Sequence, residues 1–218
     1  MSLFSFIKLI HIICGGTALI SGAIAIGFRS HVKRHKPFGK VYFLAMTFVF
    51  VTSVYMGLVK KNMFLICVGF FTYYMCIKAF RSLKLKKIPI DQRPEMFDWA
   101  IELVFGLAHL YFVLLSVWFF MQQQISAAVI GMVFGLIGLR MNFSTVKRFT
   151  RKSPFTNQWL LTHIGNMLGS YIGAFTAFLV NNSGILPLPP IALWLLPTVV
   201  FTPLIFLEIR KRSHLTKS

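Results

Sequence analysis

Charged residues are scarce in this sequence: they make up 13% of its 218 residues, whereas a typical soluble domain carries about a quarter. A soluble protein of this length needs more polar side chains to cover its surface, so the composition argues against a water-soluble fold. The three cysteines lie inside apolar stretches, show no metal-ligand spacing and cannot all pair, which argues against a disulfide framework. Gly-x-Ser-x-Gly, His-Glu-x-x-His and phosphate-binding glycine motifs are absent, so no motif supports hydrolase or nucleotide-driven chemistry.

Long apolar stretches are what the sequence has instead, and hydrophobic residues make up 56% of the chain. The stretches cover residues 5–28, 41–59, 62–80, 99–121, 125–139, 158–180 and 186–207. Each is near the roughly 20 residues that a helix needs to cross a bilayer, although the fifth is shorter. They lack the alternation of barrel strands, and the first is too long for a signal peptide. We therefore predict an all-α polytopic membrane protein, with seven transmembrane helices in a single bundle over residues 1–218.

Lysine and arginine residues segregate between the two sides of this seven-helix arrangement. Of the 23, three fall on one side, Lys8, Lys60 and Lys61, and the rest fall on the other. Cytoplasmic loops retain an excess of basic residues, so we predict the N-terminus outside and the C-terminus in the cytoplasm. This pattern explains the net charge of +18 without a nucleic-acid partner, and we expect the basic loops to contact the anionic lipid headgroups of the bilayer.

Small residues recur at helical spacing in three of the apolar stretches. Transmembrane helices approach each other most closely through such residues, because lipid leaves no hydrophobic drive between helices. The residues are Gly15, Ala18, Gly22 and Ala25 in the first stretch, Gly131, Gly135 and Gly138 in the fifth, and Gly165, Gly169, Gly173 and Ala177 in the sixth. We expect these three helices to form the tight centre of the bundle.

Few ionisable residues lie inside the apolar stretches, where inserting a charge at mid-helix costs about 2.5–3.5 kcal/mol. They are His11, Glu102, His109 and His163. In the fourth helix, Glu102 and His109 share a face with Asp98 and Phe105. This stripe suits proton transfer; in the alternative interpretation the two acidic residues lie at the interface and only His109 is truly inside the membrane.

The sixth helix places His163 on one face with Asn166 and Ser170, at a depth close to that of Glu102. A buried carboxyl group and a buried imidazole are each less costly when they pair, so we expect His163 to hydrogen-bond Glu102. The alternative is that each histidine is a neutral packing residue bonded to a backbone carbonyl.

Cofactor binding is left open by the sequence. A haem b would need two axial imidazoles at similar depth, and the candidates are His11, His109 and His163. His11 and His109 differ in depth by about 8 Å at 1.5 Å per residue, which counts against that pair. Retinal lacks a lysine in the seventh stretch, and copper lacks a second histidine beside His11 and Cys14.

Two segments carry a resemblance to a known family. The first is His11 followed by Gly15, Gly16, Ala18 and Gly22, and then the run His35-Lys36-Pro37-Phe38-Gly39-Lys40-Val41-Tyr42 with Met46. The second runs from Trp159 through His163, Asn166 and Met167 to Val180. Together they resemble the bacterial membrane proteins grouped as domain of unknown function 2306. The resemblance implies a bacterial inner-membrane location and marks a cytoplasmic loop signature at His35, Gly39 and Tyr42, with further positions at His11, Trp159, His163 and Met167.

Two classes of function follow from these observations. The first is a small transporter or structural membrane component in which the histidines only pack. The second is a redox or proton-handling membrane protein that uses the intramembrane histidines, with haem as one cofactor. Neither the substrate nor the oligomeric state is indicated by the sequence.

Overall fold

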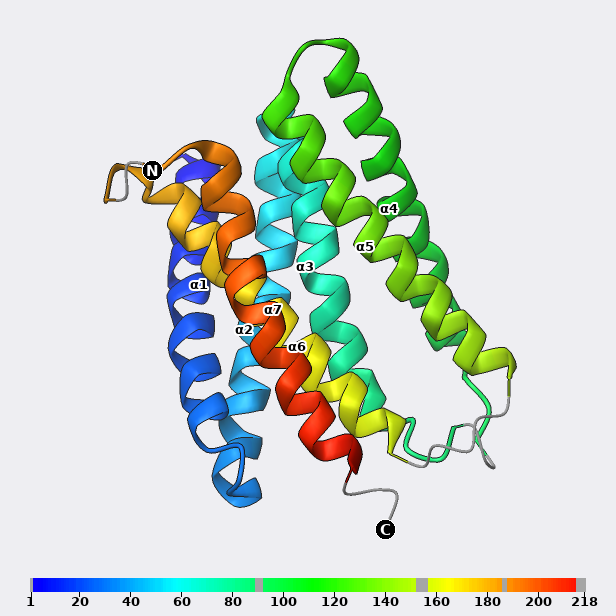
Figure 1. Ribbon diagram of the computed structural model, residues 1–218. Helices are drawn as coiled ribbons and strands as arrows, with labels where there is room; N and C mark the ends of the chain where they lie inside the picture. The colour runs from blue at the N-terminus through cyan, green and yellow to red at the C-terminus, as the bar shows by residue number, and fades with distance from the viewer. Residues whose placement is uncertain (1, 89–91, 152–156, 186–187, 215–218) are drawn as a thin grey trace. The chain divides into compact units, whose positions relative to one another are not determined.

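The computed structural model describes residues 2–88, 92–151, 157–185 and 188–214, and across them the chain is helical, with no strand (Figure 1). The helices are α1 Leu3–Gly27, α2 Val32–Val59, α3 Met63–Ser82, α4 Met96–Met121, α5 Ile125–Thr150, α6 Gln158–Asn181, the 3₁₀ turn η1 Ser183–Ile185, and α7 Pro190–His214. Six of them, α1 to α5 and α7, are long and apolar enough to cross a membrane, judged by length and composition. These helices indicate a multi-pass membrane protein.

Two helices are much longer than the apolar stretches that predicted them. α2 begins at Val32, so His35, Gly39 and Tyr42 lie on a helix, and the prediction that they form a loop is wrong. α5 continues beyond the apolar stretch to Thr150 and buries Asn142 on the way. Hydropathy marks only the apolar part of a helix, while lysine, arginine and other polar residues with good helix propensity extend it further.

Residues 1–69 form the first of two compact units. In it α1 and α2 make an antiparallel hairpin, because His11 contacts Thr52 and the carbonyl of Ala25 contacts His35. α1 turns its small face into this hairpin and buries Ala18, Ser21, Gly22 and Ala25, whereas Gly15 has open space beside it. The first unit is therefore held by close approach of small residues and by two histidine hydrogen bonds.

Residues 70–218 form the second unit, which contains α3 from Phe70 onward. Every residue of α3 from Phe71 to Cys76 is buried. α4 runs antiparallel to α3, and α5 returns antiparallel to α4 after the turn at Gln122–Gln124 (Figure 1). α7 packs along α6. Lys152 and Lys217 of the basic side, and the first two residues of the seventh apolar stretch, lie outside the described residues.

The glycines of α5 and α6 contact different partners. On α5, Gly131, Gly135 and Gly138 lie against Ser116, Val113 and His109 of α4. On α6, Gly169 and Gly173 lie against Met75 and Thr72 of α3, and Gly165 lies against Ile209 of α7. The small faces of α5 and α6 therefore pack against other helices and not against each other, because small-residue spacing identifies a contact face without identifying its partner.

Candidate functional site

Glu102 is the centre of a buried polar cluster in the second unit. It lies on the buried face of α4 with Asp98, Phe105 and His109, and is only 7% exposed. Its Oε2 accepts hydrogen bonds from the Tyr74 hydroxyl of α3 at 2.7 Å and from the Asn142 side-chain amide of α5 at 2.8 Å. Among the described residues nothing donates to Oε1. The groups that hydrogen-bond this carboxyl group directly are therefore both neutral.

Asn142 joins Glu102 to His109. Its Nδ2 faces the carboxyl group, so its Oδ1 is left to accept from His109 Nδ1 at 2.7 Å. This arrangement assigns the proton of a neutral His109 to Nδ1 and makes Nε2 an acceptor. His109 Nε2 is buried and has no hydrogen-bond partner. The ring is enclosed by the rings of Phe71 and Tyr74, whose centroids lie 6.0 and 5.1 Å from its own.

Two cations lie next to this cluster. Lys78 Nζ donates to the Met141 carbonyl at 3.0 Å and to the Tyr74 hydroxyl at 3.4 Å, so one hydroxyl group separates it from Glu102. Arg148 is half-buried on α5, interacts electrostatically with Glu102, and donates from Nη1 to Thr162 Oγ1 of α6 at 2.6 Å. The site thus combines one carboxyl group with two basic side chains and draws on α3, α4, α5 and α6.

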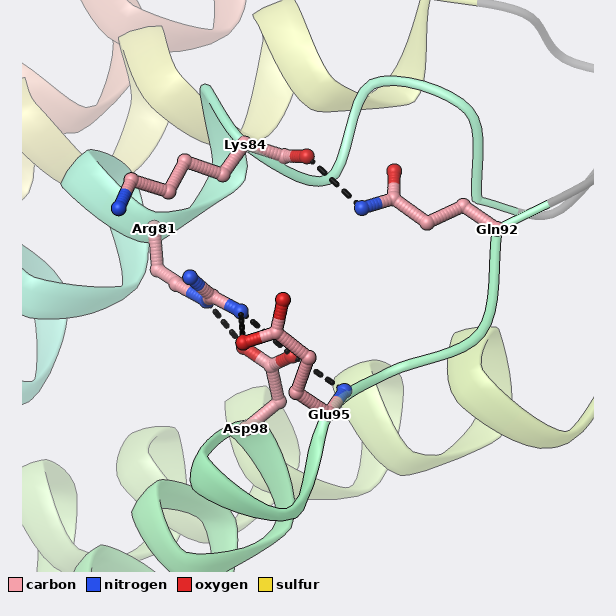
Figure 2. Close-up of polar contacts among 5 residues, drawn as sticks. All are labelled: Arg81, Lys84, Gln92, Glu95 and Asp98. Carbon is pink, nitrogen blue, oxygen red and sulfur yellow. Dashed lines mark hydrogen bonds and ion pairs between the residues drawn. The ribbon is translucent and has the colours of Figure 1, made fainter.

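A second carboxyl group of α4 is bound in a different way. Asp98 accepts two hydrogen bonds from Arg81 of α3, from Nε to Oδ1 at 2.6 Å and from Nη2 to Oδ2 at 3.1 Å (Figure 2). Asp98 also accepts from the backbone N–H of Glu95, and Glu95 forms an ion pair with Arg81 (Figure 2). The Gln92 amide donates to the Lys84 carbonyl nearby and ties the α3–α4 connection to the end of α3. This ion pair fixes the start of α4 onto α3.

The predicted pair of Glu102 and His163 is not formed. His163 Nδ1 donates to the backbone carbonyl of Ala79 at 3.0 Å, and the partners of Glu102 are Tyr74 and Asn142. Ala79 lies in the last turn of α3, where carbonyl groups have no N–H of their own helix to accept from, so the imidazole satisfies one of them. This is the arrangement that the alternative interpretation of the histidines describes.

The other predicted polar residues have hydrogen-bond partners of their own. His11 Nδ1 bonds Thr52 in the first unit at 2.9 Å, and His35 Nδ1 donates to the Ala25 carbonyl there at 2.9 Å. Asn166 Nδ2 donates to the Thr162 carbonyl on α6, while its Oδ1 is buried without a partner. Of the predicted polar residues, the structure brings Glu102 and His109 together in one network.

Sequence reasoning did not find four members of the site: Tyr74, Lys78, Asn142 and Arg148. Lys78 and Arg148 looked like part of the basic side that sets orientation, and Asn142 lies beyond the end of the fifth apolar stretch. One signal was present, because Asn142 follows Gly135 and Gly138 by seven and four residues and so continues the small face of α5.

The residues around His109 do not fit a haem. A Cβ atom at Gly138 would lie 2.7 Å from His109 Nε2, so the α5 backbone occupies the space that a porphyrin iron would need. His11 belongs to the first unit, and His163 belongs to the second. Over the described parts of the chain, no group of three His, Cys, Asp or Glu side chains is placed to hold a metal ion.

Comparison with known proteins adds no relative: no protein-family model, curated protein or solved structure matches this chain. The chemistry therefore has to be derived from the arrangement itself. The Glu102 carboxyl group is buried among apolar helices, accepts hydrogen bonds from neutral donors, and has two cations nearby that do not bind it directly. Such a carboxyl group is suited to exchange a proton.

Proposed function

We propose that this chain is a small proton-handling transport protein of the membrane, in which Glu102 takes up and releases the proton. The observation that carries the proposal is the difference between the two buried carboxyl groups of α4. Asp98 accepts hydrogen bonds from Nε and Nη2 of the Arg81 guanidinium group, whereas the side chain of Glu102 accepts hydrogen bonds from Tyr74 and Asn142. Protonating Asp98 would break a direct ion pair, and protonating Glu102 would not.

Both charge states of Glu102 have support nearby. The ionised form is stabilised by Lys78, which reaches it through the Tyr74 hydroxyl, and by Arg148. The neutral form keeps hydrogen-bonding partners, because a protonated carboxyl group still accepts at one oxygen while it donates at the other. A carboxyl group with a purely structural role needs to be stable in only one charge state. Stabilisation of both the ionised and the neutral form of Glu102 therefore favours proton exchange.

Asn142 and His109 act as positioning residues in this proposal. An amide group carries no exchangeable acid–base proton at physiological pH, so Asn142 does not pass protons from Glu102 to His109. Instead His109 fixes the orientation of the Asn142 amide, and that orientation presents Nδ2 to the carboxyl group. The proton of Glu102 therefore exchanges on the side of Tyr74 and the two cations.

Proton flux into liposomes tests this function. We expect Glu102→Gln to lower the flux driven by a potassium diffusion potential about a hundredfold, the size of effect that follows loss of a positioned acid–base group. Flux is followed with a pH-sensitive dye trapped in the vesicles. Glu95→Gln is the matched control, because Glu95 is the N-cap residue of the same helix and its side chain is 65% exposed, and this variant should conduct as the unaltered protein does. Equal flux in the two variants would contradict the proposal.

We also propose that the chain crosses a bacterial inner membrane seven times, with its N-terminus outside. The segregation of lysine and arginine supports this orientation, as do the exposed basic residues at the start of α2, which suit anionic headgroups. These residues are Lys33, Arg34, Lys36 and Lys40.

Single cysteines introduced into a variant without native cysteines test the orientation. Positions 33 and 147 should react with a membrane-impermeant thiol reagent only after the cells are opened, whereas positions 123 and 182 should react in intact cells. All four residues are exposed, so accessibility is matched. Labelling of position 123 only after opening would exclude the seven-helix arrangement.

A further inference from the structure

Arg148, which interacts electrostatically with Glu102, has hydrogen-bond donors that are not satisfied. Its Nη1 is used by Thr162, while its Nε is buried without a partner. Nε and Nη2 lie along the same edge of the planar guanidinium group, and no hydrogen bond joins Nη2 to any of the described residues. An unpaired donor on a buried guanidinium is costly, so this edge calls for a ligand with acceptor atoms.

The same edge is occupied elsewhere in this protein. Arg81 uses Nε and Nη2 to hold both oxygens of Asp98. A guanidinium edge of this kind matches two oxygens of a carboxylate or phosphate group, and pairs formed in this way are stronger and more specific than single hydrogen bonds. Arg148 therefore offers the binding geometry of Arg81 without an aspartate in place.

Lys78 supplies a second positive charge near Glu102. Its ammonium group has three donors, and two of them are used by Met141 and Tyr74. Lys78 and Arg148 also interact electrostatically with each other. When Glu102 is neutral, the carboxylate left near Arg148 among the described residues is Asp98, and Asp98 is paired directly with Arg81.

We propose that Arg148 and Lys78 bind an oxyanion that bears a carboxylate or phosphate group, and that this anion binds together with the proton of Glu102. This proposal rests on the proposed function, which supplies the proton on Glu102. It adds the class of substrate that is transported together with that proton. Ionised Glu102 competes for the two cations, whereas protonated Glu102 releases them to the anion. The charged or titratable groups that face Glu102 are Tyr74 and Lys78 from α3 and Arg148 from α5, with Asp98 and His109 on its own helix.

Calorimetric titration of the full chain in a maltoside detergent with acetate, and separately with inorganic phosphate, tests the site. Arg148→Lys keeps the charge but loses the two-donor edge, and we expect it to weaken binding of the preferred anion about tenfold. Arg140→Lys is the matched control on an exposed arginine of the same helix and should bind as the unaltered protein does. Lys78→Gln should also weaken anion binding. If Arg148→Lys does not fold, the affinity of Lys78→Gln tests the anion site in its place. Unchanged affinity in the folded variants overturns the anion site.

Glu102→Gln separates the anion site from the proton. Because glutamine imitates the neutral acid, this variant should bind the anion about tenfold more tightly than the unaltered protein at neutral pH and should lose the part of the pH dependence that titration of Glu102 contributes. Unchanged affinity and pH dependence in Glu102→Gln overturn the coupling. Unchanged proton flux in Glu102→Gln overturns the proposed function, and the Arg148→Lys affinity still tests the anion site by itself.

Nanodiscs distinguish a soluble anion from a lipid headgroup. If phosphatidylglycerol in phosphatidylcholine discs displaces acetate from the unaltered protein but not from Arg148→Lys, the anion at this site is a lipid phosphate, which supports the oxyanion site with a lipid source. If acetate binds equally in discs with and without phosphatidylglycerol, the site is supported with a soluble source. No binding of acetate, inorganic phosphate or phosphatidylglycerol overturns it.

Discussion

Replacing Arg81 by alanine should lower the free energy of unfolding by about 3 kcal/mol, because it leaves the Asp98 carboxylate buried and without its cation. The Asp98 side chain is 1% exposed and accepts two of its hydrogen bonds from Arg81. The remaining donor is the backbone N–H of Glu95, which cannot neutralise the charge. Unfolding in mixed micelles titrated with dodecyl sulfate measures the difference.

The control for this prediction is the other partner of Arg81. Glu95 is 65% exposed, so Glu95→Gln removes an ion pair that is screened by water and should cost about 1 kcal/mol or less. If Arg81→Ala and Glu95→Gln lower stability equally, the ion pair of Arg81 and Asp98 does not fix α4 onto α3.

Adding one methyl group at Gly138 should destabilise the protein by about 2 kcal/mol, within the range that overpacking of a filled interior causes. The Cβ atom would lie closer than 3 Å to three atoms of the His109 ring. That ring is held by Asn142 and enclosed by Phe71 and Tyr74, so it cannot turn away without breaking its hydrogen bond. The same unfolding titration measures the loss, and proton flux should fall with it because Asn142 positions Glu102.

Gly16→Ala is the matched control for Gly138→Ala. Gly16 is an exposed residue of α1 with no atom within 4 Å of a Cβ, so alanine there should be neutral or should stabilise the helix by up to about 1 kcal/mol. Stability of Gly138→Ala equal to that of Gly16→Ala would contradict the tight contact between α4 and α5.

The helices could be predicted because hydropathy and length constrain them strongly. Over the described residues, each of the seven predicted apolar stretches overlaps a helix, and the buried stripe of Asp98, Glu102 and His109 on α4 follows from helical spacing alone. The errors lie where helices leave the apolar region. α2 and α5 continue through basic and polar residues that hydropathy treats as loop.

The partners of Glu102 could not be predicted because they depend on which helices are neighbours. Depth pointed to His163, but α3 lies beside α4 and provides Tyr74, while α5 provides Asn142. Spacing in one helix fixes which residues share a face, and it carries no information about the helix opposite. Lys78 was also hidden, because a lysine near the end of an apolar stretch has the same sequence signature whether it sets orientation or enters a buried cluster.

The infrared spectrum of the carboxyl C=O stretch during a pH titration tests most directly whether Glu102 exchanges a proton. A band of a protonated, buried carboxyl group should grow as the pH falls and disappear as it rises again in the unaltered protein. The band should be missing from Glu102→Gln and present in Glu95→Gln. A spectrum without this band at any pH, or a band that persists in Glu102→Gln, would contradict proton exchange at Glu102.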